Sequence, residues 1–400
     1  MRVFLLGAGA SKSYGQSPSG QRMPIARDFF QTFDKLEISA NPWVLQEGLL
    51  GYLLHNGVRD PHAYLRTGVD IEALHSKIEE AREKAIRENR DFIDFMIENR
   101  AYVELIFIFA SVINEIQNGP ISNPHLSIAR HLTPDDAVIT FNWDTLMDRA
   151  LAEGTAWRID FGYGVTPRAI FSDGWRAPRQ ADGANAPKLL KLHGSTNWIT
   201  AYPLVEGGQT VLTHDLDPGT LHIFESATEP YPCWAGRYMH GYQPFSYGYY
   251  PPNLLEVPGR AAPEGHMILS VRPKVPWRPE GTAPNDGLVS MPLIIPPVQN
   301  KTYDLFGSLF STLWTSAEDL LAAADQIIII GYSFPITDRQ SNSLFTKAFM
   351  RRSSMPRIVI IDPAPERVAE KFRSEFGIAD THLLVLKEYF SGEFDLAAVL

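Results

Sequence analysis

The strongest constraint on the fold is a stretch near the carboxyl end of the chain, residues 326–334, which reads QIIIIGYSF. Four consecutive isoleucines leave neither face of an extended strand polar. This pattern is typical of a strand in the middle of a parallel sheet that helices cover on both faces. The glycine, tyrosine and serine that follow predict a tight turn at the end of this strand.

Other short apolar segments repeat the pattern and are separated by segments with helical periodicity. The predicted strands lie at residues 3–6, 137–141, 186–192, 293–297, 357–361 and 383–386. We therefore expect an α/β fold with a Rossmann-like parallel sheet, formed by a single nucleotide-binding domain over residues 1–400. Ligands of such sheets bind at the carboxyl ends of the strands.

Two regions interrupt this order. Residues 70–118 are predicted to form a helical module, because a charged amphipathic piece leads into an apolar one. Residues 199–291 are expected to form an irregular insertion, since 16 of the 30 prolines lie between Pro203 and Pro297. Eight aromatic residues lie within residues 231–250. They indicate either a cap over the site or an oligomer interface, or else a loop region packed on itself.

Composition narrows the class of protein. The formal charge of −10 and a pI near 5.6 argue against strong direct nucleic-acid binding. Cys233 is the only cysteine, so the chain forms no internal disulfide and no zinc site of cysteines alone. We expect a cytoplasmic protein without a bound metal. We also expect no membrane span, because the longest apolar run, residues 105–113, is about half of the ~20 residues needed.

The first candidate site residues follow the strand at residues 3–6, in the sequence GAGAS. Gly7, Ala8, Gly9 and Ser11 form a glycine turn that opens a helix, an arrangement in which backbone N–H groups approach a phosphate. Lys12 stands where the third glycine of the dinucleotide fingerprint would lie. The turn by itself is therefore a weak indication of a nucleotide site.

Polar residues follow the strand at residues 137–141 in the same way. Asn142 and Asp144 lie at a strand-to-helix junction, where Asn and Asp are also common as turn and cap residues. For Asn142 a structural and a catalytic role have equal support. For Asp144 the residue pattern favours the structural role.

Three further strand ends supply candidates. His193 follows the apolar run 186–192; a lone histidine is more often structural, but its ring titrates near neutral pH and suits a general base. Gly331 and Ser333 form the turn after residue 330. Asp362 ends the strand 357–361, where a carboxylate can accept both hydroxyls of a ribose or simply open a turn.

Taken together, these motifs resemble the sirtuin superfamily. The matching stretches occur in the family's order and span nearly the whole chain: GAGAS at 7–11, TFNWD at 140–144, LHG at 192–194, GYSF at 331–334 and IDP at 361–363. The resemblance implies that NAD is the ligand and that Asp144 and Gly331 also belong to its pocket.

The chain departs from the deacetylating sirtuins in two respects. It lacks the two Cys-x-x-Cys pairs of their zinc ribbon, and residues 23–29, MPIARDF, only loosely match their Gly-Ile-Pro-Asp-Phe-Arg signature. It is more similar to bacterial sirtuin-like proteins that consume NAD during defence against phage. Because the matching motifs span nearly the whole chain, the protein resembles the stand-alone subunit that pairs with a HerA-type DNA-translocating ATPase.

This resemblance implies an NAD glycohydrolase that releases nicotinamide and ADP-ribose. His193 would accept a proton from a ribose hydroxyl or a water, and Asn142 would orient the same group. The glycine turn would hold the pyrophosphate, Ser333 the adjoining ribose or phosphate, and Asp362 the adenosine ribose.

The alternatives are a non-catalytic subunit that binds NAD or ADP-ribose, and a deacylase or ADP-ribosyltransferase. We expect a homo-oligomer, because the aromatic insertion suits a subunit contact.

Overall fold

A computed structural model describes most of the chain. The described residues are 1–36, 48–88, 92–171, 175–180, 185–201, 203–206, 209–212, 219–225, 290–295, 308–335 and 339–400. The aromatic stretch at 231–250 and Cys233 lie outside them.

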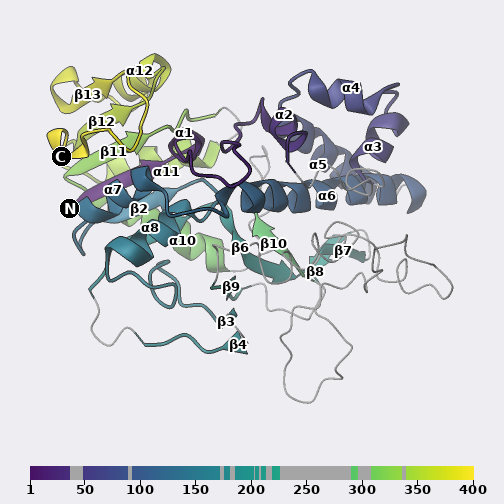
Figure 1. The fold of residues 1–400 in the computed structure, drawn as a ribbon, viewed down its shortest axis with the longest axis horizontal. Helices are drawn as coiled ribbons and strands as arrows, with labels where there is room; N and C mark the ends of the chain where they lie inside the picture. Colours follow the sequence, from purple (N-terminus) through teal and green to yellow (C-terminus); the bar gives the residue numbers. More distant parts are fainter. Residues whose placement is uncertain are drawn as a thin grey trace.

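A six-stranded sheet forms the core of one half of the molecule, on the left in Figure 1. All neighbouring strands run parallel, in the order β13-β12-β11-β1-β2-β5. The strands are β1 (Arg2–Leu6), β2 (Ala137–Thr140), β5 (Lys188–Lys191), β11 (Gln326–Ile330), β12 (Arg357–Ile361) and β13 (Leu383–Leu386). Counted along the chain, this is the 3-2-1-4-5-6 order of the doubly wound dinucleotide-binding fold, with its reversal between β1 and β11. The predicted fold class is confirmed.

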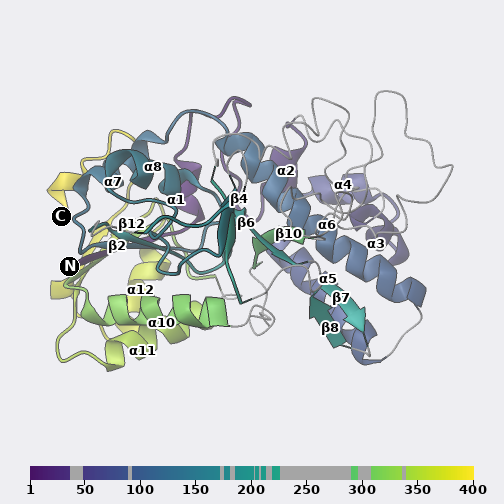
Figure 2. The ribbon, with the colours of Figure 1, turned by 90° about the horizontal axis from the view of Figure 1, so that it is seen from below.

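Helices cover both faces of the sheet, as the apolar character of β11 requires. In Figure 2, α7 (Asn123–His131) and α8 (Leu146–Gly154) lie on one face, and α10 (Ser308–Ala323) and α11 (Arg339–Met350) lie on the other. The sheet strands β1 and β11 are almost entirely buried between these layers. Short elements complete this half: α1 (Ala8–Lys12), α12 (Glu366–Ser374) and the 3-10 turns Asp380–His382 and Leu396–Ala398.

A helical module packs beside the sheet around a second apolar core. It contains the two helices expected within residues 70–118 and three shorter ones before them. These are α2 (Phe29–Phe33), α3 (Leu49–His55), α4 (Pro61–Arg66), α5 (Ile71–Arg87) and α6 (Phe92–Gln117). Asp70 caps α5, since its carboxylate accepts the N–H groups of Glu72 and Ala73 at 3.0 and 3.1 Å.

A second sheet of five strands lies below the first in Figure 1, in the order β10-β6-β9-β3-β4. Its strands are β3 (Ala169–Phe171), β4 (Trp175–Arg176), β6 (Gly194–Ala201), β9 (His222–Phe224) and β10 (Ser290–Ile294). A separate hairpin joins β7 (Pro203–Glu206) to β8 (Gln209–Leu212).

This second sheet corrects one expectation about the main sheet. The strand predicted near residues 293–297 is β10, which pairs antiparallel with β6 and does not join the parallel sheet. A proline within it, Pro292, lies beside a register shift, which is where a strand tolerates the missing N–H. Most of the described residues within the 199–291 range also lie in strands, and residues 226–289 lie outside the described residues.

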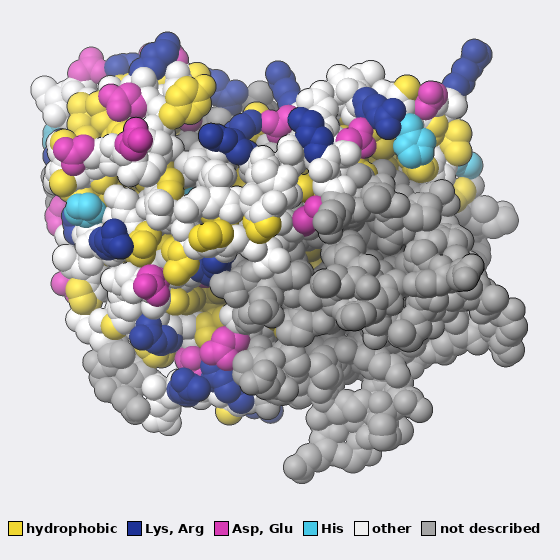
Figure 3. Space-filling view, in the orientation of Figure 1, with side chains coloured by type: hydrophobic (Ala, Val, Ile, Leu, Met, Phe, Trp, Pro, Cys, Tyr) yellow, Lys and Arg dark blue, Asp and Glu magenta, His cyan; other side chains and the backbone are white. Residues whose placement is uncertain are grey.

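No helix of the described residues is long and apolar enough to cross a membrane. On the face shown in Figure 3, basic and acidic side chains are interspersed over the described surface rather than gathered by sign.

A tight contact joins the two strands at the reversal of the sheet. Gly331 has a φ of +60°, and a Cβ atom placed on it would lie 2.4 Å from the backbone nitrogen of Ala10. A Cβ atom on Gly9 would lie 2.7 Å from the Cα atom of Gly331. Only glycines allow the turns after β1 and β11 to approach this closely.

We predict that Gly331→Ala destabilises the protein by about 3 kcal/mol, because it adds a backbone clash to the strain of a positive φ. Gly20→Ala is the matched control, since Gly20 has a φ of +69° but nothing within 4 Å of the added atom. It should cost only about 1 kcal/mol. Urea unfolding of both variants measures the difference, and equal losses would contradict the packing role of Gly331.

Candidate active site

The ends of the six parallel strands lie level with one another. Leu6 is the register partner of both Thr140 and Ile330, and the pairing continues outwards at the same level to Lys191 on one side and Ile361 on the other. The turns that leave these strands therefore meet at one edge of the sheet. The sequence-predicted site residues lie on five of these turns.

The turn after β1 lies at the centre of this edge. Gly7 N–H donates to Ile330 O at 3.0 Å, and Gly9 N–H donates to Gly331 O at 2.9 Å. Ala8 and Gly9 are exposed, whereas Gly7 is buried. The glycines therefore bring two backbone turns together at the sheet reversal, and the N–H of Gly9 is already used within the protein.

Asn142 joins the turn after β2 to the turn after β1. Its Nδ2 donates to Gly7 O and to Ser11 Oγ, both at 2.7 Å. A carbonyl oxygen only accepts hydrogen bonds, so Gly7 O fixes which end of the carboxamide faces inwards. The group that Asn142 can offer a ligand is consequently its carboxamide oxygen, an acceptor.

Ser11 and Asp144 hold that orientation in place. Ser11 is buried, accepts from Asn142 and donates to Asp144 Oδ2 at 2.5 Å. The other oxygen of Asp144 accepts the N–H of Leu146 at 3.0 Å, at the start of α8. Both carboxylate oxygens of Asp144 are thus engaged within the protein, and its assignment to the cofactor pocket stays a prediction. In this structure the hydroxyl of Ser11 serves the same network, and its assignment to a nucleotide stays a prediction.

His193 lies at the end of β5 and is 3% exposed. Its ring packs against Phe141 and Trp314, with centroid distances of 5.0 and 6.4 Å. Phe141 in turn stacks on Tyr332, with ring centroids 4.4 Å apart. This aromatic cluster places the imidazole beside both the turn after β2 and the turn after β11.

Gly194 allows the chain to turn sharply after His193. Its φ is +78°, and a Cβ atom there would lie 2.0 Å from the carbonyl oxygen of Leu293. The carbonyl of His193 accepts the N–H of Ile295 at 2.8 Å. The second sheet therefore begins at the residue after the histidine, and this backbone bond joins His193 to the chain just beyond β10.

The remaining predicted residues lie across the reversal. Asp362 is half-buried, and its Oδ1 accepts the N–H of Ala364 at 2.8 Å, which is the turn-opening role. Ser333 is exposed. Arg367 of α12 donates to the carbonyls of Ser333 and Phe334 at 2.8 and 2.7 Å and so holds their turn.

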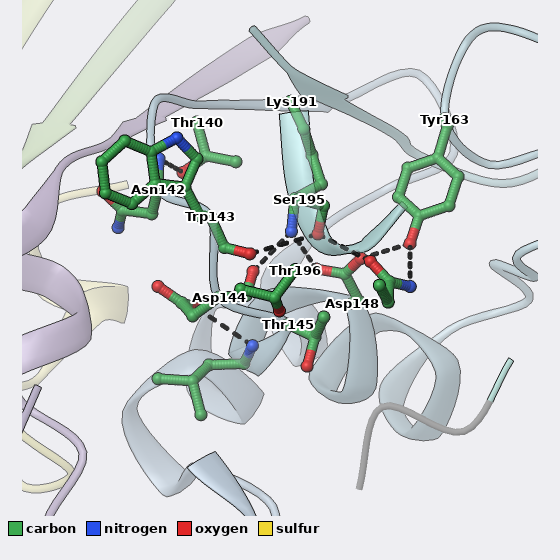
Figure 4. Close-up of polar contacts among 12 residues, drawn as sticks. Thr140, Asn142, Trp143, Asp144, Thr145, Asp148, Tyr163, Lys191, Ser195 and Thr196 are labelled. Carbon is green, nitrogen blue, oxygen red and sulfur yellow. Dashed lines mark hydrogen bonds and ion pairs between the residues drawn. The ribbon is translucent and has the colours of Figure 1, made fainter. Parts of the chain in front are cut away.

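The structure also shows a buried polar network that the sequence analysis missed (Figure 4). Lys191 is fully buried and forms an ion pair with Asp148, with Nζ and Oδ2 3.0 Å apart. Its Nζ also donates to the backbone carbonyl of Asp144. The available signal was a lysine at an inward position within an otherwise apolar strand end, between Leu190 and Leu192.

The end of α6 ties the helical module to the same turns. The side-chain oxygen of Gln117 accepts the N–H of Thr145 at 2.7 Å, and its nitrogen donates to Thr196 Oγ1 at 3.3 Å. Phe109 of α6 packs against Trp143 at 4.9 Å between ring centroids. No local pattern in the sequence indicates these contacts, since the partners are far apart along the chain.

Among the described residues, no group of three or more His, Cys, Asp or Glu side chains is placed to hold a metal ion. The chemistry that the edge offers is that of a carboxamide acceptor, an imidazole and backbone turns.

No protein-family model matches the chain, and no curated protein matches it. Among solved structures, the chain is similar to a mutant of a Sir2 homologue in complex with ADP-ribose, at 13% identity over 97% of this chain and 86% of that chain, with a TM-score of 0.35. It is also similar to Sir2 bound to an inhibitor, 2′-O-acetyl-ADP-ribose and a deacetylated peptide, at 14% identity over 95% of each chain, with a TM-score of 0.28. Likeness at this level does not decide the function.

A pH-dependent stability follows from the site's surroundings. Burial lowers the pKa of His125 to about 4, although the nearby carboxylate of Asp144 opposes the shift. The ring is neutral in the folded protein and gains a proton on unfolding below pH 6.5. Its contribution to stability is therefore complete above pH 6.5 and is lost as the pH falls towards 4.

We predict that wild-type protein loses about 3 kcal/mol more stability than His125→Asn between pH 7 and 4. The asparagine carboxamide reaches the position of Nδ1, so it keeps a hydrogen-bond partner for the hydroxyl of Ser122, which lies 2.7 Å from that atom. Urea unfolding at several pH values measures both slopes. Parallel slopes would show that His125 does not titrate in this way.

Proposed function

We propose that this chain binds NAD across the reversal of its parallel sheet and hydrolyses the bond between nicotinamide and ribose. The observation that carries the proposal is the strand order, which places the turns after β1 and β11 on the two sides of the reversal. Sheets of this order bind dinucleotides at that point. The residues on the two sides then divide the work between binding and chemistry.

The adenosine half is assigned to the side of β11 and β12. Asp362 at the end of β12 has one carboxylate oxygen bonded to Ala364, which leaves the other to accept ribose hydroxyls. Ser333 is exposed and lies on the turn after β11, between the end of β12 and the glycine turn after β1. The pyrophosphate would cross Ala8 and Gly9, the exposed residues of the central turn.

The nicotinamide half is assigned to the side of β2 and β5. The scissile bond breaks through a state with positive charge on the ribose ring, and a neutral nicotinamide leaves. The reaction therefore needs an acceptor that orients a water or hydroxyl and a base that takes its proton. Asn142 offers a fixed carboxamide oxygen because its nitrogen is engaged by Gly7 and Ser11. His193 supplies the base from the neighbouring strand.

We predict that His193→Ala and Asn142→Ala each lower the rate of nicotinamide release by at least about 100-fold. His131→Ala is the matched control, because His131 ends α7 near the opposite edge of the sheet, where its carbonyl accepts from Arg2. Chromatography of nicotinamide, ADP-ribose and cyclic products measures the rate. Near wild-type turnover in either site variant would overturn its assigned role.

We predict a different effect for Asp362→Ala. Contacts to the adenosine ribose are made equally in the ground and transition states, so their loss raises KM more than it lowers kcat. Steady-state kinetics with NAD separates the two constants. An unchanged KM would place the adenosine elsewhere.

The biological setting is part of the same proposal and rests on the motif resemblance alone. It is the depletion of NAD during anti-phage defence, in a homo-oligomer that pairs with a HerA-type ATPase. The alternatives remain a non-catalytic NAD or ADP-ribose subunit and a deacylase or ADP-ribosyltransferase, which the product analysis distinguishes. Light scattering at micromolar concentration tests the oligomer, and a monomer of about 45 kDa, the mass of one chain, would contradict it.

A further inference from the structure

We propose that Lys191 is a positioning residue that sets the distance between the turn carrying Asn142 and the strand end carrying His193. The purpose of this spacing rests on the proposed function. The hydrogen bond from Lys191 Nζ to the Asp144 carbonyl, called the tie below, does not. Lys191 is the last residue of β5, two positions before His193. Its Nζ donates to the carbonyl of Asp144, two positions after Asn142. One side chain therefore connects the two turns.

The sheet alone does not fix this spacing. The last backbone bond between the two chain segments at the strand ends is from Leu192 N–H to Thr140 O, at 3.0 Å. Beyond it, the segments separate into turns and meet again at the carbonyl of Trp143, which accepts the N–H of Thr196 at 2.9 Å and lies 3.2 Å from the hydroxyl oxygen of Ser195. Lys191 spans the interval between these two backbone bonds, which is the interval that contains both candidate catalytic residues.

The burial of Lys191 indicates a role beyond stability. The side chain is 0% exposed, and its partner Asp148 is 6% exposed. Burying an ammonium group has a large desolvation cost, and apolar residues of similar volume often stabilise a fold equally well or better. Asp148 lies in the first turn of α8, where the helix dipole favours a carboxylate. The ion pair is thus held in a defined place and direction.

A second set of contacts fixes Asp148 from the other side. Tyr163 donates its hydroxyl to Asp148 Oδ1, and Asn197 Nδ2 donates to Tyr163 at 3.4 Å. Burial, reinforced by the Asp148 charge, raises the pKa of Tyr163, so its hydroxyl remains a donor. Ser195 completes the chain by donating to Asn197 Oδ1 at 2.6 Å. Figure 4 shows the side chains of Lys191 and Tyr163 meeting at Asp148.

The test removes the tie without stranding a charge. In Lys191→Met/Asp148→Asn both charges are lost, the amide oxygen can still accept from Tyr163, and methionine cannot donate to Asp144. Arg2→Met/Asp136→Asn is the matched control, because the Asp136 carboxylate is also buried, its Oδ2 lies 2.6 Å from Arg2 Nη2, and the pair lies at the amino ends of the strands, away from the two turns. Both double variants are made in the full chain.

Amide hydrogen exchange tests the tie independently of any activity. We expect the amides of Thr145, Leu146 and Thr196 to exchange at least about tenfold faster in the Lys191 double variant, while those of Gly7 and Gly331 keep their wild-type rates. The control pair should leave all five unchanged. Unchanged exchange at the first three amides, or equal acceleration at all five, would overturn the proposal.

Steady-state kinetics with NAD tests whether the tie positions Asn142 and His193 for catalysis. Displacing the two turns should lower kcat at least about tenfold while KM stays within about threefold, because the adenosine side of the site is untouched. A merely structural role would lower the amount of folded protein and leave kcat per folded molecule unchanged, which would overturn the proposal. If wild-type protein releases no nicotinamide, the proposed function fails, and hydrogen exchange alone decides the role of Lys191.

Discussion

The parallel hydrogen-bond register of the sheet is the constraint on which the candidate site depends. Because Leu6 is level with both Thr140 and Ile330, the turns that follow these strands begin at the same height. Residues more than 130 positions apart along the chain, such as Ser11 and Asp144, are thereby brought within hydrogen-bond distance. The contact between Gly9 and Gly331 then closes the sheet at its reversal without space for a side chain.

Side chains complete what the register begins. The amide of Asn142 is oriented by Gly7 and Ser11, so its direction is set by the turn after β1 and not by its own turn. The ring of His193 packs against aromatic rings, and its backbone carbonyl accepts the N–H of Ile295, directly after β10 of the second sheet. The helical module contributes through Gln117, which joins α6 to the start of α8. The site is thus supported by all three parts of the described fold.

The parallel sheet could be predicted from the sequence because its signal is local. An apolar run such as residues 326–330 determines both strand and burial, and the polar residue after each run marks the ligand edge. The second sheet was missed, because the strand near β10 was assigned to the parallel sheet, β3, β4 and β9 are only two or three residues long, and the prolines of the region pointed away from strands. Of the site, Asn142 and His193 were identifiable by position, whereas the use of Ser11 and Lys191 depends on partners distant in sequence.

The most direct test of the account is a crystal structure of His193→Ala grown with NAD, in which the slowed reaction preserves the intact dinucleotide. The account predicts NAD across the sheet reversal, with the adenosine ribose at Asp362, the pyrophosphate over Ala8 and Gly9, and the nicotinamide ribose within hydrogen-bond distance of the Asn142 carboxamide oxygen. NAD bound elsewhere on the chain, or an empty carboxyl edge at saturating NAD, would contradict it.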